Sequence, residues 1–131
     1  MKAKFSSSWI SSSQRRKQRK YRYNAPLHIK KKFMRCNLSK FLRTDVKRKN
    51  IIVIKGDKIR VMNGDFKNKE GTVREVNIKN TKVYVEEIKK KGEKGADIFV
   101  PLNPSNVQII ELNLKNPKRI KEEKEKAKKN D

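Results

Sequence analysis

KGDKIRVMNGDFKNKEGTVREVN, residues 55–77, is the most specific segment of this 131-residue chain. Apolar residues alternate with polar ones on both sides of its centre, and this period of two is typical of a half-buried β-strand. The centre, residues 63–69, is rich in Asn, Gly, Asp and Lys, which favour tight, exposed turns. Gly64 and Gly71 suit positions that need a positive φ or a close approach of the backbone. The stretch therefore predicts two strands joined by a basic turn.

The same strand period extends outward through residues 51–114. Val83 and Val85 flank Tyr84, and apolar residues alternate again from Ile98 to Leu102. Turn-forming residues separate these runs at Gly56-Asp57, Asn63–Asp65, Asn80 and Gly92–Gly95. Short strands with turns between them and no long helix indicate an antiparallel meander.

In two of these strands the apolar phase slips, once after Val73 and once after Ile109. A slip of one place reverses the face on which side chains lie, so it marks a bulge or bend where one strand serves two faces. Small barrels need such bends in order to close. We therefore predict a mainly β fold with a compact five-stranded barrel over residues 51–114.

Residues 24–50 predict short basic helices. Asn24 is a candidate cap, Pro26 suits a first helical turn, and Ile29 and Phe33 lie one turn apart among lysines. Beyond a break near Asn37, apolar residues repeat at helical spacing from Leu38 to Leu42, which predicts a second short helix.

The two ends of the chain are polar. Residues 1–23 form a Ser-rich and then strongly basic arm, which we expect to be disordered when free and extended when bound. Residues 115–131 form a charged tail with Glu and Lys four places apart, which predicts a solvated helix. This tail can serve solubility or contact RNA, and the sequence leaves both open.

Charge is distributed unevenly along the chain, whose formal net charge is +23. Residues 1–50 carry 17 basic side chains and one acidic one, whereas residues 51–114 carry 12 basic and nine acidic ones. Uncompensated positive charge opposes compaction, so the N-terminal part requires a dense external polyanion. Nucleic acid fits that requirement, and the basic runs are also compatible with a nuclear import signal.

Several functional classes are disfavoured by composition. One cysteine, Cys36, and one histidine, His28, leave too few ligands for a structural zinc site and exclude an internal disulfide. No acid-base, nucleophile or phosphate-loop pattern is present, so we expect no enzyme activity, cofactor, metal or small-molecule substrate. Apolar runs are too short for a membrane span or a secretory signal, which predicts a soluble intracellular protein.

Residues 55–77 also resemble the KOW motif, a strand-loop-strand unit that begins SH3-like barrels in ribosomal proteins and transcription elongation factors. The resemblance extends to YRYNAPLHIKKKFMRCNLSKFLR, residues 21–43, and VPLNPSNVQIIELNL, residues 100–114. In this order the segments are similar to the universal large-subunit ribosomal protein twenty-four family, in its eukaryotic and archaeal form. The similarity covers about residues 20–121.

The resemblance implies a structural constituent of the large ribosomal subunit that binds rRNA, supports subunit assembly and lies near the nascent-chain exit tunnel. It implies neighbouring large-subunit proteins and factors that handle nascent chains as partners. The location would be the cytoplasmic ribosome, with a nucleolar stage during assembly in a eukaryote.

Our candidate RNA-binding residues are of two kinds. Arg and Lys can contact phosphates, and aromatic side chains can stack on unstacked bases. On the extension these are Arg15, Arg16, Arg19, Tyr21, Arg22, Tyr23, His28, Lys30, Lys31, Lys32, Arg35, Lys40 and Arg43. On the barrel they are Lys58, Arg60, Lys67, Lys69 and Arg74, with Gly64 and Gly71 as the motif glycines. Trp9 and His28 can pack within the protein or touch RNA, and each glycine can serve a turn, RNA proximity, or both.

Two other classes remain open at this point. A transcription or chromatin factor with a KOW motif would contact protein and double-stranded DNA, and it would show comparable affinity for duplex DNA and association with polymerase. A binder of anionic membranes would need a long amphipathic cationic helix, whereas the expected helices are short or polar throughout.

Overall fold

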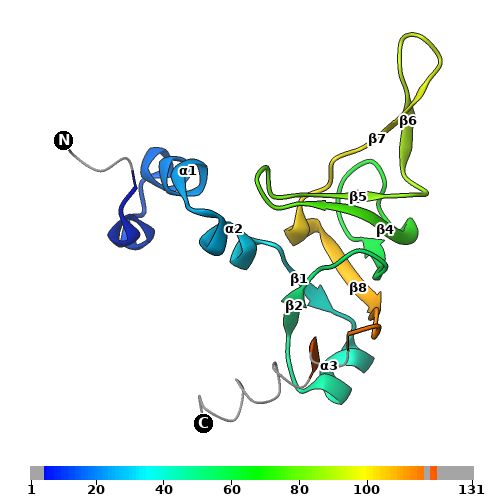
Figure 1. The fold of residues 1–131 in the computed structure, drawn as a ribbon, viewed down its shortest axis with the longest axis horizontal. Coiled ribbons are helices and arrows are strands. Elements are labelled where there is room, and N and C mark those ends of the chain that lie inside the picture. Colours follow the sequence, from blue (N-terminus) through cyan, green and yellow to red (C-terminus); the bar gives the residue numbers. More distant parts are fainter. Residues whose placement is uncertain (1–4, 117–118, 121–131) are drawn as a thin grey trace.

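A computed structural model describes residues 5–116 and 119–120 of the chain. Helical elements and strands alternate along the first half, and strands dominate the second half (Figure 1). In chain order the elements are η1 (Ser7–Ser11), α1 (Arg15–Asn24), α2 (Leu27–Phe33), β1 (Arg35–Leu38), α3 (Lys40–Val46), β2 (Asn50–Ile52), β3 (Lys58–Val61), β4 (Glu70–Asn77), β5 (Lys82–Val85), β6 (Lys89–Lys91), β7 (Asp97–Phe99), η2 (Pro104–Asn106) and β8 (Val107–Glu111).

Within the described residues, six strands form one sheet in the order β2-β1-β8-β3-β4-β5, and β6 pairs with β7 separately. The strands β3, β4 and β5 follow one another as antiparallel neighbours, so the predicted meander is confirmed. In contrast, β1 runs parallel to β8, so residues 35–38 lie beside the last strand of the sheet. A mainly β fold is therefore present, while closure into a five-stranded barrel stays a prediction.

Both predicted phase slips are bulges. In β4 the register against β5 shifts between Val73 and Glu75, and in β8 two residues, Ile109 and Glu111, pair with the adjacent Ile59 and Lys58 of β3. Each extra residue bends its strand and turns the following side chains to the other face. The apolar side chains on both sides of each slip can therefore face one interior.

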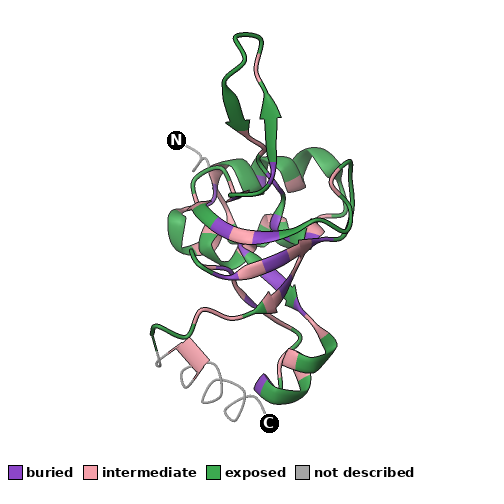
Figure 2. Ribbon diagram, turned by 90° about the vertical axis from the view of Figure 1, so that its right-hand side faces the viewer, coloured by how far each residue is buried: buried purple, intermediate pink, exposed green. Residues whose placement is uncertain are grey.

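The core lies inside this curved sheet (Figure 2). Its most deeply buried large side chains include Met34, Leu38, Ile59, Ile88 and Ile109, which come from elements far apart in the sequence. Alternate residues of β1, β3 and β5 are buried, as expected for strands with one covered face. The small core is thus assembled from both the N-terminal and the C-terminal parts of the chain.

The region 24–50 contains a strand that we did not predict. Residues Arg35–Leu38 form β1, in which Cys36 and Leu38 are buried and the residues between them are exposed. Met34, Cys36 and Leu38 alternate with polar residues, as in a strand. We did not assign a strand because the apolar residues on both sides repeat at helical spacing. The predicted second helix is α3, which begins after Ser39, whose hydroxyl accepts a hydrogen bond from the Leu42 amide.

The expectation of an extended N-terminal arm is wrong for residues 15–24, which form α1. One face of α1 carries Tyr21, which is only 6% exposed, and this burial offsets the entropy cost of ordering. The helix ends at Asn24 because Ala25 precedes Pro26 and is extended, with ψ of 136°. Asn24 therefore ends α1 and does not cap α2, whose N-cap position is held by Pro26.

Residues 89–99 project away from the sheet as a hairpin of β6 and β7 (Figures 1 and 2). The guanidinium of Arg74 lies 4.1 Å from the centre of the Phe99 ring, and Lys89 covers the same ring at 5.3 Å. These cation–π contacts connect the base of the hairpin to β4.

Most of the predicted C-terminal helix lies outside the described residues, as do residues 1–4 of the arm. Arg119 is described, and its guanidinium forms a buried ion pair with Asp57, at 2.6 Å from Nη1 to Oδ1. The tail is therefore attached to the sheet at this point. The division of the chain into four segments at residues 23, 50 and 114 stays a prediction.

Candidate nucleic-acid interface

The candidate interface is built mainly on α1 and α2, which lie beside the sheet (Figure 1). Tyr21 is the buried residue of α1, whereas α2 has no fully buried residue and Leu27 at its start is 63% exposed, so most side chains of both helices face solvent. Tyr23 is 82% exposed, so its ring is available to a partner, and His28 is also exposed and does not pack in the core. The exposed predicted cations on these two helices are Arg15, Arg16, Arg19, Arg22, Lys31 and Lys32.

A groove separates α1 and α2 from the turn between β4 and β5, and it holds a space of about 580 Å³. Its lining residues come from both sides and are Arg19, Arg22, Tyr23, Lys30, Lys79, Asn80 and Thr81. The Lys30 ammonium donates a hydrogen bond to the Lys79 carbonyl at 3.1 Å, which joins the two sides of the groove. The structure thus brings four of the predicted residues together with three that the sequence did not indicate.

Tyr21 corrects one of our assignments. Its ring packs against Phe5, with centroids 5.2 Å apart, and against Phe33, with centroids 6.0 Å apart. Burial in this aromatic cluster leaves Tyr21 poorly placed to stack on a base, so it anchors α1 to the protein instead. Trp9 is half-buried and lies under the Lys20 ammonium at 5.0 Å.

Several of the predicted cations are already engaged by other groups. Arg60 donates to Glu70 through Nε at 2.9 Å, and Lys58 lies 3.4 Å from Glu111. Arg43 donates to the Leu38 carbonyl at 2.9 Å, and Arg74 covers Phe99. These exposed or half-exposed contacts are individually weak and can be exchanged for phosphate. Lys67 and Lys69 are exposed on the β3–β4 turn, Arg35 is exposed on β1, and Lys40 is exposed at the start of α3.

The two glycines of the motif serve different needs. Gly64 has a φ of 98°, in the left-handed region that favours glycine, and open space surrounds it. At Gly71 an added Cβ would collide with the Glu87 carboxylate and come within 2.5 Å of Val85 Cγ1. Gly64 therefore satisfies a turn, and Gly71 allows β4 to pass close to the end of β5.

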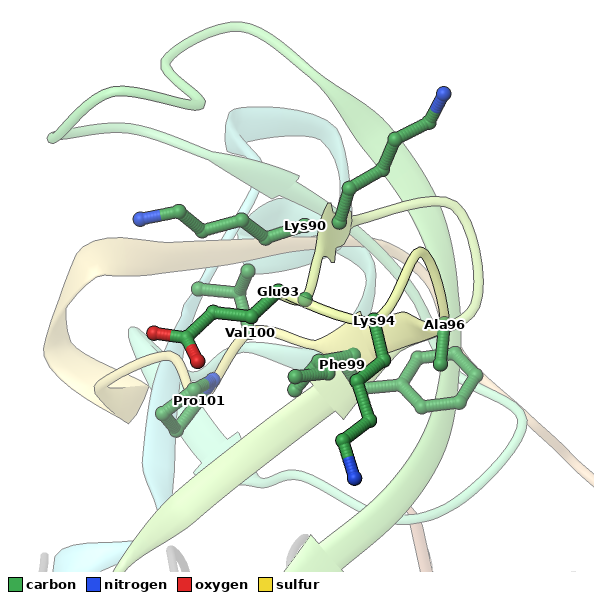
Figure 3. A pocket seen from close by; sticks show the side chains of 10 residues that line it. Lys90, Glu93, Lys94, Ala96, Phe99, Val100 and Pro101 are labelled. Atoms are coloured by element: carbon green, nitrogen blue, oxygen red, sulfur yellow. The ribbon is translucent and has the colours of Figure 1, made fainter.

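The β6–β7 hairpin carries a second open pocket, with a volume of about 680 Å³ (Figure 3). Figure 3 shows the long side chains of Lys90, Glu93 and Lys94 around the apolar Phe99 and Val100. Ile98 beside them is 57% exposed. This pocket combines an apolar surface with charged side chains around it.

Sequence reasoning missed Lys79, Asn80 and Thr81 as part of the interface, although Asn80 is a turn signal. Thr81 has a φ of 53°, which is rare for a β-branched residue and is not visible in the sequence. It also missed Asp57 and Arg119, since 62 residues separate them and only the folded chain joins them.

The described residues contain no group of three or more His, Cys, Asp or Glu side chains that could hold a metal ion. Cys36 is fully buried, and burial, with a contribution from Asp57 opposed by Arg119, raises the pKa of its thiol to about 12. The thiolate is the reactive form, so this side chain is inert at neutral pH. No helix within the described ranges has the length and apolar character needed to cross a membrane.

Comparisons with known proteins agree with these features. A family model that describes ribosomal proteins L26 of eukaryotes and their L24-type counterparts of archaea matches residues 12–126. A large ribosomal subunit protein uL24 from Methanocorpusculum labreanum is 43% identical over 111 residues, which are 85% of this chain and 92% of that protein. Another, from Methanosarcina barkeri, is 42% identical over 108 residues, 82% of this chain and 93% of that protein. The match spans the basic helices as well as the sheet, and the chain therefore belongs to the family of eukaryotic L26 and archaeal L24-type ribosomal proteins.

Proposed function

We propose that this chain is a structural, RNA-binding component of the large ribosomal subunit. One observation carries the proposal: a member of this ribosomal family exposes the cations of α1 and α2 together on a surface beside the sheet. The mechanism is electrostatic docking, in which Lys and Arg displace counterions condensed on rRNA. The contoured surface of helices and turns then selects a particular RNA shape. No catalytic step, cofactor or small-molecule substrate is part of this function.

The proposed scaffold is a five-stranded SH3-like barrel made of β3, β4, β5, the segment leading to Leu102, and β8. The mutual backbone hydrogen bonds of Val83 and Leu102, both 2.9 Å long, support this arrangement because they connect β5 to that segment. The chain then turns through η2 into β8, which pairs with β3. A closed scaffold would hold the basic helices and the β3–β4 turn in fixed relative positions.

Within the subunit, we propose that the chain joins early in assembly and lies near the exit of the nascent-chain tunnel. Its partners would be large-subunit rRNA, neighbouring ribosomal proteins and factors that handle emerging chains. The exposed Ile98 and the pocket on the β6–β7 hairpin support a protein partner on that side. The chain would be found on cytoplasmic ribosomes, and in the nucleolus during assembly if the cell is eukaryotic.

Sedimentation of the tagged chain from its native cell tests this function. The wild-type chain should travel with large subunits in a sucrose gradient after a moderate salt wash. A variant with Arg15, Arg16 and Arg19 each changed to Gln should be lost from the particles at lower salt, since it lacks three exposed cations. Gln retains good helix propensity, so α1 should persist.

The matched control changes three exposed lysines outside the predicted binding set, Lys49, Lys55 and Lys115, to Gln. It has the same net charge as the α1 variant and should be released at a salt concentration closer to that of wild type. Absence of the wild-type chain from large subunits, or equal affinity for duplex DNA with polymerase association, would favour a transcription or chromatin factor instead.

A further inference from the structure

We propose that the groove between α1, α2 and the β4–β5 turn is a binding site for one unstacked RNA nucleotide, whose base stacks on Tyr23. This inference rests on the proposed RNA-binding function and assigns a particular ligand to one part of the surface.

The α1 side of the groove supplies both kinds of contact that a nucleotide needs. Arg19 lies three residues before Arg22 and four before Tyr23, so the three side chains share one face of the helix. The Arg22 guanidinium lies 5.3 Å from the centre of the Phe33 ring, which orients it toward α2. Tyr23 is 82% exposed, and its ring can therefore accept a base without rearrangement of the core.

The opposite wall is held in place before any ligand binds. The Lys30 ammonium donates a hydrogen bond to the Lys79 carbonyl at 3.1 Å and so links α2 to the turn. The backbone N–H of Asn80 donates to Asn77 Oδ1 at 3.1 Å. The unusual φ of 53° at Thr81 fixes the end of the turn. A wall that is already ordered reduces the entropy cost of binding. The side-chain amide of Asn80 offers a donor and an acceptor to the edge of a base.

The charge of the groove favours an anion, and its size fits a ligand as small as one nucleotide. Four lining residues are cations and none is acidic. A space of about 580 Å³ falls within the roughly 300–1,000 Å³ of small-ligand sites and cannot admit a double helix. An exposed aromatic ring among cations is the combination that recognises a splayed-out base with its phosphate. A paired nucleotide, whose base is stacked inside a helix, would leave Tyr23 unused.

The test uses the full chain and two RNA duplexes with the same paired sequence, one of which also carries a single bulged nucleotide, 2-aminopurine, a base that loses fluorescence on stacking. The wild-type chain should bind the bulged RNA more tightly than the fully paired one and quench the probe. Tyr23→Ala should weaken binding to the bulged RNA by roughly five- to hundredfold and abolish the quenching. Tyr23→Phe retains the ring and should behave like wild type.

Phe41→Ala is the matched control, because Phe41 is also an aromatic residue that is 82% exposed, and it lies on α3 outside the groove. This variant should bind and quench like wild type. Undiminished quenching by Tyr23→Ala, or an equal loss with Phe41→Ala, would overturn the nucleotide site. A wild-type chain that travels with large subunits yet treats the two RNAs alike would also overturn it, while the proposed function would stand. A chain absent from the particles would overturn the function itself.

Discussion

Asp57 is the most constrained polar side chain of the core, since it is completely buried and carries a carboxylate. Arg119 meets it with two guanidinium nitrogens, at 2.6 Å and 2.7 Å, and the backbone amides of Ile54 and Asn113 donate to the same carboxylate. A buried ion pair is tolerated only when such hydrogen bonds compensate for lost hydration. One residue near the C-terminus thus completes the hydrogen bonding of a residue in the motif.

Replacing Arg119 with Ala should therefore destabilise the fold by about 3–5 kcal/mol, because it leaves the Asp57 carboxylate buried without its cation. Urea unfolding followed by circular dichroism measures the change. The control, Arg60→Ala, breaks a half-exposed pair and should cost less than about 1 kcal/mol. Equal stability of the Arg119→Ala variant and wild type would show that the pair does not form in solution.

Cys36 gives the stability of the fold a dependence on alkaline pH. Its pKa is raised from 9.0 to about 12 by burial, so above pH 9 the unfolded chain loses a proton that the folded chain retains. The contribution of this group to the free energy of unfolding should consequently fall by on the order of 1 kcal/mol between about pH 8 and about pH 10. Urea titrations at the two pH values measure it.

Cys36→Ala is the comparison for the pH effect, because it keeps the lysine and tyrosine titrations and removes the thiol. The difference between the two pH values should be smaller in this variant by about the amount assigned to Cys36. An identical pH dependence in both proteins would contradict the assignment.

At the scale of elements, the β3–β4 hairpin and its neighbour β5 depend on two glycines for different reasons. The turn at Gly64 requires a positive φ, and the crossing at Gly71 requires the absence of a Cβ beside Val85. Strand pairing of Ile59 with Gly71 places this second glycine in the middle of the hairpin ladder. A collision there displaces two strands, whereas strain at Gly64 stays within an exposed turn.

Gly71→Ala should accordingly cost about 1–3 kcal/mol through overpacking, and Gly64→Ala should cost about 1 kcal/mol through backbone strain. Thermal and urea unfolding would measure both. In a Val85→Ala background, which removes the Cγ1 atom that the new methyl would meet, Gly71→Ala should cost less. Strict additivity of Gly71→Ala and Val85→Ala would show that the crossing is not the cause.

At the scale of the whole molecule, the charge asymmetry of the sequence becomes a spatial one. The first 50 residues have a net charge of +16 and supply the exposed helices α1 and α2, whereas residues 51–114 have a net charge of +3 and supply most of the sheet. The sheet balances its own charges with pairs such as Arg60–Glu70. The helices are therefore the part of the molecule that depends on an external polyanion.

Binding to rRNA fragments should be strongly salt-dependent. Contact with about six to ten phosphates predicts a loss of affinity of roughly 10³ to 10⁵ between 50 and 200 mM salt. The Arg15, Arg16 and Arg19 to Gln variant should reduce the slope of log K against log salt by about 2.7, since each lost phosphate contact removes about 0.9. Fluorescence anisotropy over a salt series measures the slopes, and a flat response of the wild-type chain would rule out this mechanism.

Features that depend on local periodicity and composition could be predicted from the residues alone. Alternating apolar residues and turn-forming residues predicted β3, β4 and β5 as a meander, and the slips after Val73 and Ile109 predicted the two bulges that the register contains. Charge counts predicted a polyanionic partner, and the resemblance to a ribosomal family was confirmed by the family match. Each of these inferences depends on neighbours within a few residues, or on totals.

Contacts between distant segments became visible in the folded chain alone. The strand β1 forms because β8 and β2 pair with it. The helix α1 is fixed in position because the Tyr21 ring packs against Phe5 and Phe33. The pair Asp57–Arg119 and the groove that joins α1 to the β4–β5 turn have no local signal in the sequence. In each case the stabilising contact becomes available only after the chain between the partners has folded, so the physical reason lies in packing rather than in local preference.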